Sequence, residues 1–191
     1  MRILEQRALR GPNRYSRYPT MFMLLDIGDF EERPSDALPG FPERLIELMP
    51  TLRSHHCSVG APGGFVQRLH RGTWAGHIVE HIALELQCLA GMEVGFGKTF
   101  GTSTEGVYKV VYRYRVESVG LRVGKEAVAL VEAVAEAQSF DVDRLVLELK
   151  ELRESDMLGP STQSIVDEAQ RRGIPVQRLN DASLIQLGHG E

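Results

Sequence analysis

Two histidines and a glutamate stand close together in the stretch His-Ile-Val-Glu-His, residues 77–81. The stretch lies in a run from Gly72 to Ala90 that reads as a helix, on which residues four apart share a face. His77 and His81 can therefore bind one metal ion, for which Zn2+ is the usual choice. Glu80 is placed to act as general base toward water. This order of residues is that of inverted zinc peptidases and predicts metal-assisted hydrolysis.

A zinc site of this kind needs a third protein ligand and one open position. By proximity we expect Glu85, one turn beyond His81, to be that ligand or to orient a histidine. The other candidates are carboxylates after the helix and two thiols: Glu105, Glu117, Cys57 and Cys88. For the two cysteines, a small buried residue is the more ordinary interpretation.

The ordinary alternative is a helix whose polar face is merely solvated. One face of the run is apolar enough to pack on a core: Ile78, Ile82, Leu86 and Leu89. The opposite stripe carries the motif: His77, Glu80, His81, Leu84, Glu85 and Cys88. From the helix alone, a solvated stripe and a metal site are equally compatible with this pattern.

Composition bounds the class of protein. With 191 residues and 42% hydrophobic residues, the chain can form one sizeable core, or one domain and an appendage. A net charge of -4 argues against nucleic-acid binding, and no apolar run reaches membrane-spanning length. The first residues lack the apolar region of a signal peptide. Two cysteines are too few for a disulfide framework, so we expect a cytoplasmic protein with reduced thiols.

Hydrophobic periodicity predicts strands and helices in an irregular order. The predicted strands are residues 1–9, 20–27, 55–58 and 107–116, and the predicted helices are 41–49, 65–70, 73–90, 119–137 and 141–153. Thr73 is the expected N-cap of the motif helix, and Gly91 is expected to end it. Residues 95–106 read as a mobile polar loop over the metal face. The absence of regular βαβ units favours an α+β fold, an antiparallel sheet packed with helices.

The composition shifts near residues 156–160, and the last segment reads as a helix at 161–172 with short strands at 174–179 and 183–187. A hairpin this short is marginal by itself. We therefore expect residues 1–157 to form one domain and residues 158–191 to be the opening of a second domain that has been cut away.

Several segments together resemble the cyanophycin synthetase family. The most specific is residues 72–87, Gly-Thr-Trp-Ala-Gly-His-Ile-Val-Glu-His-Ile-Ala-Leu-Glu-Leu-Gln. The other matching segments lie at residues 1–5, 8–13, 32–35, 39–41, 62–65, 158–162, 172–175 and 187–188. The resemblance covers essentially the whole chain, and its last segments look like the family's lead-in to an ATP-grasp domain.

This resemblance implies a function. Cyanophycin is a poly-aspartate whose side-chain carboxyls carry arginine, and in the family's full-length, oligomeric enzymes an ATP-grasp domain adds Asp and a Mur-ligase-like domain adds Arg, using ATP and Mg2+. The chain would be the N-terminal domain alone, without ligase activity. In some members this domain also cuts the polymer into primers. By the family's motif, His77 and His81 would bind Zn2+ and Glu80 would be the general base.

A polymer of this kind presents carboxylates and guanidinium groups to the protein. The cations that we expect to bind its carboxylates are Arg10, Arg14, Arg17, Lys98, Arg113 and Arg115. For Lys98, a solvated side chain is the ordinary alternative. Two further functions stay open at this point: a polymer-binding domain without catalysis, and a purely architectural domain without polymer affinity.

Overall fold

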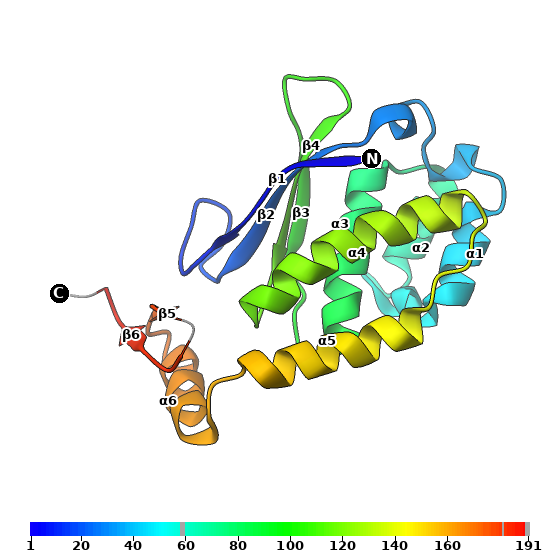
Figure 1. Cartoon of the computed structure of the whole chain (residues 1–191). Helices are drawn as coiled ribbons and strands as arrows, with labels where there is room; N and C mark the ends of the chain where they lie inside the picture. The colour runs from blue at the N-terminus through cyan, green and yellow to red at the C-terminus, as the bar shows by residue number, and fades with distance from the viewer. Residues whose placement is uncertain (58–59, 181, 190–191) are drawn as a thin grey trace.

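A four-stranded antiparallel sheet with helices packed on one face forms the centre of the computed structural model, which describes residues 1–57, 60–180 and 182–189 (Figure 1). Its elements are, in chain order, β1 (Arg2–Leu9), β2 (Thr20–Asp26), η1 (Gly28–Glu31), η2 (Ser35–Ala37), α1 (Phe41–Leu48), η3 (Pro50–Ser54), α2 (Gly64–Arg71), α3 (Ala75–Leu89), β3 (Gly97–Gly101), β4 (Val107–Arg113), α4 (Glu117–Ala135), α5 (Val142–Asp156), α6 (Pro160–Arg171), β5 (Val176–Arg178) and β6 (Ile185–Leu187). The predicted antiparallel sheet packed with helices is confirmed.

The order of the strands in the sheet is β1-β2-β4-β3, so β3 lies at an edge. On β2, Met21 pairs with Tyr112 of β4, and Met23 pairs with Val110. All four side chains are fully buried, which marks the face of the sheet that the helices cover. The alternate residues of β2 and β4 point to the other face, because side chains alternate along a strand.

Helices α3 and α4 pack against each other and against the sheet, α3 on β3 and β4 and α4 on β1 and β2. Two glycines allow α4 to come close. A Cβ at Gly120 would lie 2.7 Å from Cε of Met21, and a Cβ at Gly124 would lie 2.6 Å from Cε of Met23. Helix α3 is buried almost all round, because its apolar face meets the core, η3 packs against it, and Phe65 of α2 contacts His77 and His81.

Three local predictions are wrong. Residues 55–57 form no strand, and Ser58, the last residue of that prediction, lies outside the described residues. Residues 97–101, taken for part of a loop, form β3, because pairing with β4 outweighs their glycine-rich, polar composition. Thr73 does not cap α3, which begins at residue 75, and its hydroxyl contacts a histidine instead.

The end of α3 is as expected: Gly91 has a left-handed φ of 82°, and the N–H of Met92 donates to the carbonyl of Gln87. Beyond α5, the predicted helix and two strands are present as α6, β5 and β6. The predicted boundary at residues 157/158 falls in the connection between α5 and α6; that this connection separates two domains stays a prediction. Among the described residues, the helices are too short or too polar to cross a membrane.

Candidate metal centre

Helix α3 brings the two histidines of the motif together, and a cysteine from another part of the chain joins them. The rings of His77 and His81 lie edge to face with centroids 4.8 Å apart. Sγ of Cys57 lies 3.3 Å from Nε2 of His77. In the described part of the chain, these three residues form the group that could hold a metal ion, with one ligand atom from each within 4.8 Å of the others.

The donor set fits zinc. A thiolate and two neutral imidazoles are borderline-soft ligands, and three protein ligands are what a catalytic zinc site provides. Burial lowers the pKa of His77 to about 4, with a further decrease from the positive charge of Arg68. Burial and the neighbouring histidines lower the pKa of His81 to about 2. Both rings are therefore neutral near pH 7, with a nitrogen lone pair available for a metal.

Cys57 reaches the group through an unusual backbone conformation. It has a φ of 54°, in the left-handed region that residues with a side chain rarely adopt. Such conformations cost roughly 1–3 kcal/mol and persist where the surrounding structure enforces them. Here the conformation lies in the short connection between η3 and α2 and places the thiol beside His77.

A chain of hydrogen bonds from Glu85 through His55 holds the ring of His81. Nε2 of His55 lies 2.5 Å from Oε2 of Glu85, and Nδ1 of His55 lies 2.8 Å from Nδ1 of His81. Burial favours a higher pKa for Glu85, but the hydrogen bonds from His55 and Thr51 outweigh it and lower that pKa. The carboxylate of Glu85 accepts from Nε2 of His55, and the other ring nitrogen of His55 lies against Nδ1 of His81. Nε2 of His81 is then the atom left for a metal.

Two further residues fix the histidine rings. Oγ1 of Thr73 lies 2.9 Å from Nδ1 of His77, which leaves Nε2 of that ring toward Cys57. The ring of Phe65, which is fully buried, stacks on His81 with centroids 4.1 Å apart. This apolar wall lowers the local dielectric around the group and strengthens the electrostatic interactions inside it.

Glu80 lies between α3 and the edge strand. Oε2 of Glu80 accepts a hydrogen bond from Oγ1 of Thr99 at 2.7 Å. The backbone of Gly97 lies so close that a Cβ there would be 2.6 Å from Oε1 of Glu80. Burial raises the pKa of Glu80 to about 7, and the Thr99 hydrogen bond limits the rise. A carboxyl group with such a pKa can both accept and return a proton near neutral pH.

The solvated-face alternative does not describe this helix. Glu80, His81 and Glu85 are between 5% and 7% exposed, and His77 is half-buried. Among the candidates for third ligand, Cys57 lies with both histidines, whereas Glu85 contacts His55. Glu117 is paired with Arg10, and Cys88 and Glu105 are exposed.

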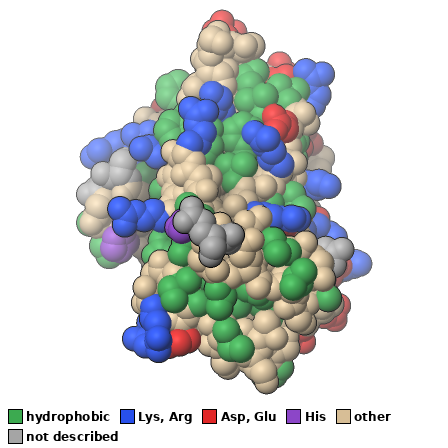
Figure 2. Space-filling view, turned by 90° about the vertical axis from the view of Figure 1, so that its left-hand side faces the viewer, with side chains coloured by type: hydrophobic (Ala, Val, Ile, Leu, Met, Phe, Trp, Pro, Cys, Tyr) green, Lys and Arg blue, Asp and Glu red, His purple; other side chains and the backbone are tan. Residues whose placement is uncertain are grey.

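The expected polymer-binding cations do not lie with the metal group. In the sheet register Lys98 pairs with Val111, next to Phe22, on the face away from the helices. Three of the six cations lie over aromatic rings: the guanidinium of Arg14 is 5.3 Å from the ring centre of Tyr15, Nζ of Lys98 is 5.3 Å from that of Phe100, and the guanidinium of Arg113 is 3.9 Å from that of Tyr18. Arg10 binds Glu117 with two hydrogen bonds of 2.7 Å, and Arg115 donates to the carbonyl of Glu93. Arg17 is exposed. Figure 2, viewed from the sheet side, shows Lys and Arg side chains among apolar ones.

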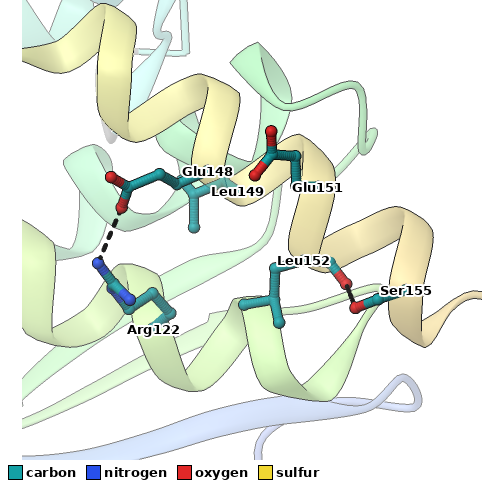
Figure 3. A pocket seen from close by; sticks show the side chains of 6 residues that line it. All are labelled: Arg122, Glu148, Leu149, Glu151, Leu152 and Ser155. Carbon is teal, nitrogen blue, oxygen red and sulfur yellow. Dashed lines mark hydrogen bonds and ion pairs between the residues drawn. The ribbon is translucent and has the colours of Figure 1, made fainter.

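Two hollows lie elsewhere. A cleft of about 620 Å3 between the sheet end and the last segment is lined by Arg10, Arg113 and Arg115 among other residues. A hollow of about 380 Å3 lies between α4 and α5, where Arg122 binds Glu148 at 3.2 Å (Figure 3). Neither is lined by Cys57, His77 or His81.

The sequence contained one signal for the residues that the motif does not include. His55, His56 and Cys57 are consecutive, and short runs of His and Cys are typical of metal sites. Gly97, Thr99 and Phe65 carried no such signal, because their contacts with the motif depend on how the sheet and α2 pack.

Comparisons with known proteins agree on one family. Residues 22–136 match the model of the cyanophycin synthase-like N-terminal domain. The chain is 47% identical to the cyanophycin synthetase of Trichormus variabilis, 46% to that of a Synechocystis strain and 43% to that of Crocosphaera subtropica. Each match covers 100% of the chain and 22% of the relative, so the chain spans about a fifth of the length of these proteins.

Proposed function

The chain belongs to the cyanophycin synthase-like N-terminal domain family, and we propose that it binds cyanophycin and hydrolyses the polymer backbone to generate primers. The observation that carries this proposal is the group of Cys57, His77 and His81, with Glu80 on the same helix as the two histidines. The relatives are named as synthetases of the polymer, which makes cyanophycin the substrate to test. Synthesis itself is an activity of the whole relatives and is not proposed for these residues alone.

In this proposal Cys57, His77 and His81 hold Zn2+, and Glu85 acts through His55 rather than as a ligand. Zn2+ bound there would supply Lewis-acid chemistry, which polarises a carbonyl group and makes water a better nucleophile. Thr73 and His55 contact Nδ1 of the two histidines, which leaves Nε2 of each ring as the nitrogen that would bind the metal.

Glu80 is the proton-transferring residue of the proposal. It accepts a proton from the water that adds to the backbone carbonyl, and it returns that proton to the nitrogen when the C–N bond breaks. Thr99 holds one carboxylate oxygen in place, and Gly97 leaves room for the other. The products are a carboxyl terminus and an amino terminus, which are the two ends that a shorter primer needs.

The deciding experiment compares Glu80→Gln with Glu93→Gln, an identical change at an exposed glutamate outside the group. Cyanophycin is incubated with each zinc-loaded variant, and polymer length and zinc content are measured. We expect Glu80→Gln to retain zinc and to cleave about 10²- to 10⁴-fold more slowly, which is the usual contribution of a general base. Glu93→Gln should match the unchanged chain. Equal cleavage by all three proteins would refute catalysis at this site.

A second candidate function is polymer binding without cleavage, and the exposed and half-buried cations of the outer sheet face favour it. Each cyanophycin unit carries a carboxylate that a lysine or arginine can pair with. Of these cations, Arg14, Lys98 and Arg113 each lie over an aromatic ring. Sedimentation with insoluble polymer tests this function independently of the metal. If the protein sediments with the polymer and does not cleave it, polymer binding is the function and hydrolysis is excluded.

A further inference from the structure

The edge strand β3 has one side without a backbone partner. In the described part of the chain, β3 pairs with β4 and with no other strand. A strand in this position presents unpaired N–H and C=O groups along its free side, and such edges accept an additional strand readily. The edge is also short and contains two glycines, Gly97 and Gly101, whose lack of side chains leaves it open.

The register of the sheet decides which residues of β3 present these groups. The N–H of Arg113 donates to the carbonyl of Phe96 at 2.8 Å, so this is a hydrogen-bonded pair of the antiparallel ladder. Because such pairs alternate, Lys98 and Phe100 also direct their backbone groups toward β4. Gly97, Thr99 and Gly101 therefore direct theirs toward the free side.

Two of the residues with outward backbone groups, Gly97 and Thr99, also face Glu80. A Cβ at Gly97 would collide with Glu80, and the hydroxyl of Thr99 donates to its carboxylate. We propose that an extended peptide backbone pairs with the free side of β3 as a fifth strand and so passes beside Glu80. This inference rests on the proposed function, because it places the backbone that would be cleaved.

The side chains of such a strand would alternate between two environments. Residues opposite Gly97 and Thr99 would point toward α3 and Glu80, because directly paired residues share a face of the sheet. Residues opposite Lys98 and Phe100 would point to the outer face. There the ammonium of Lys98 suits a carboxylate, and the ring of Phe100 suits a guanidinium group. Backbone pairing would provide the affinity and these alternate positions the specificity.

Amide hydrogen exchange tests this alternation directly. The probe is a synthetic poly-aspartate oligomer with arginine on each side chain, added to zinc-loaded, nitrogen-15-labelled Glu80→Gln protein, which should bind without cleaving. We expect the amides of Gly97, Thr99 and Gly101 to exchange about tenfold or more slowly with the oligomer bound. The amides of Lys98 and Phe100, already bonded to β4, should change little. Saturable binding without this alternation would overturn the β3 inference and leave the proposed function intact; no binding would overturn both.

A matched pair of variants at Gly101 provides a second measurement. Gly101→Pro removes the outward N–H of residue 101 and leaves the hydrogen bonds between β3 and β4 in place. Proline at Lys98 or Phe100 would instead remove a hydrogen bond to β4. Gly101→Ala keeps the N–H, and its Cβ would meet nothing within 4 Å. We expect Gly101→Pro to bind the oligomer several-fold more weakly than Gly101→Ala, with equal zinc content and similar thermal unfolding. Equal affinity of the two folded variants would overturn the inference.

Discussion

The metal group and the cationic outer face lie on opposite sides of the same two strands, β3 and β4. Thr99 contacts Glu80 on the helix side, whereas its neighbours Lys98 and Phe100 point to the outer side. In the metal group His81 is buried and Cys57 and His77 are half-buried, and the two rings are held by Thr73, His55 and Phe65. The outer cations are exposed or half-buried.

This difference shows where geometry is fixed tightly enough for chemistry. A buried polar group without a partner costs free energy, so the buried side is stable only in an arrangement that satisfies its donors and acceptors. An exposed cation can exchange its partner for water at little cost. We therefore expect changes on the buried side to have large, all-or-none effects and changes on the outer side to have small, graded ones.

The largest effect is expected from Gly97→Ala. The added Cβ would lie 2.6 Å from Oε1 of Glu80, so the carboxylate has to move. Cleavage should fall about 10²- to 10⁴-fold, as for loss of a general base, while zinc stays bound. Gly95→Ala is the matched control, because a Cβ there meets nothing within 4 Å. Polymer length over time gives the rates, and an unchanged rate in Gly97→Ala would contradict the placement of Glu80.

The next largest effect is expected from Cys57→Ser, which tests whether Cys57 is the third metal ligand. A hydroxyl is a much poorer zinc ligand than a thiolate, so zinc affinity should fall by at least about 100-fold. Competition with a chelator measures this affinity. Cys88→Ser, at an exposed cysteine outside the group, should bind zinc like the unchanged chain. Full zinc affinity in Cys57→Ser would exclude Cys57 as a ligand and would favour Glu85 as the third ligand.

The part of the site that could be predicted from sequence is the part carried by one helix. His77, Glu80 and His81 are close in the chain, and helical periodicity alone places them on one side. Cys57 and His55 come from a connection whose path is set by packing, and Cys57 reaches the group through a left-handed φ that its residue type disfavours. Strand β3 was missed for a related reason: its glycines read locally as a loop, and only the pairing with β4 makes it a strand.

Glu85→Gln should have an intermediate effect. Glutamine is neutral and binds the His55 ring less strongly than the carboxylate, so His81 is oriented less firmly. Losses of such supporting contacts typically weaken metal binding by about 10- to 100-fold. Chelator competition is again the measurement, with Glu93→Gln as the matched control. A loss as large as that in Cys57→Ser would show instead that Glu85 itself binds the metal.

The smallest effect is expected on the outer face, for Lys98→Ala. Its ammonium is exposed over the ring of Phe100, and an exposed charged contact contributes up to about 1 kcal/mol. Polymer affinity should therefore fall by about two- to fivefold, and the difference should shrink at high salt because salt screens exposed charges. Lys125→Ala, at an exposed lysine on α4, is the matched control.

Zinc content decides how the result at Lys98 bears on the comparison of the two faces. If Lys98→Ala weakens polymer binding and leaves zinc content unchanged, the two sides of β3 act independently: the outer side holds polymer, and the inner side holds metal. If the variant also loses zinc, the outer side chain supports the packing of β3 on α3, the helix that carries both histidines of the metal group. The two faces would then form one site on either side of β3. The free-energy effects of substitutions on the two faces would not be additive.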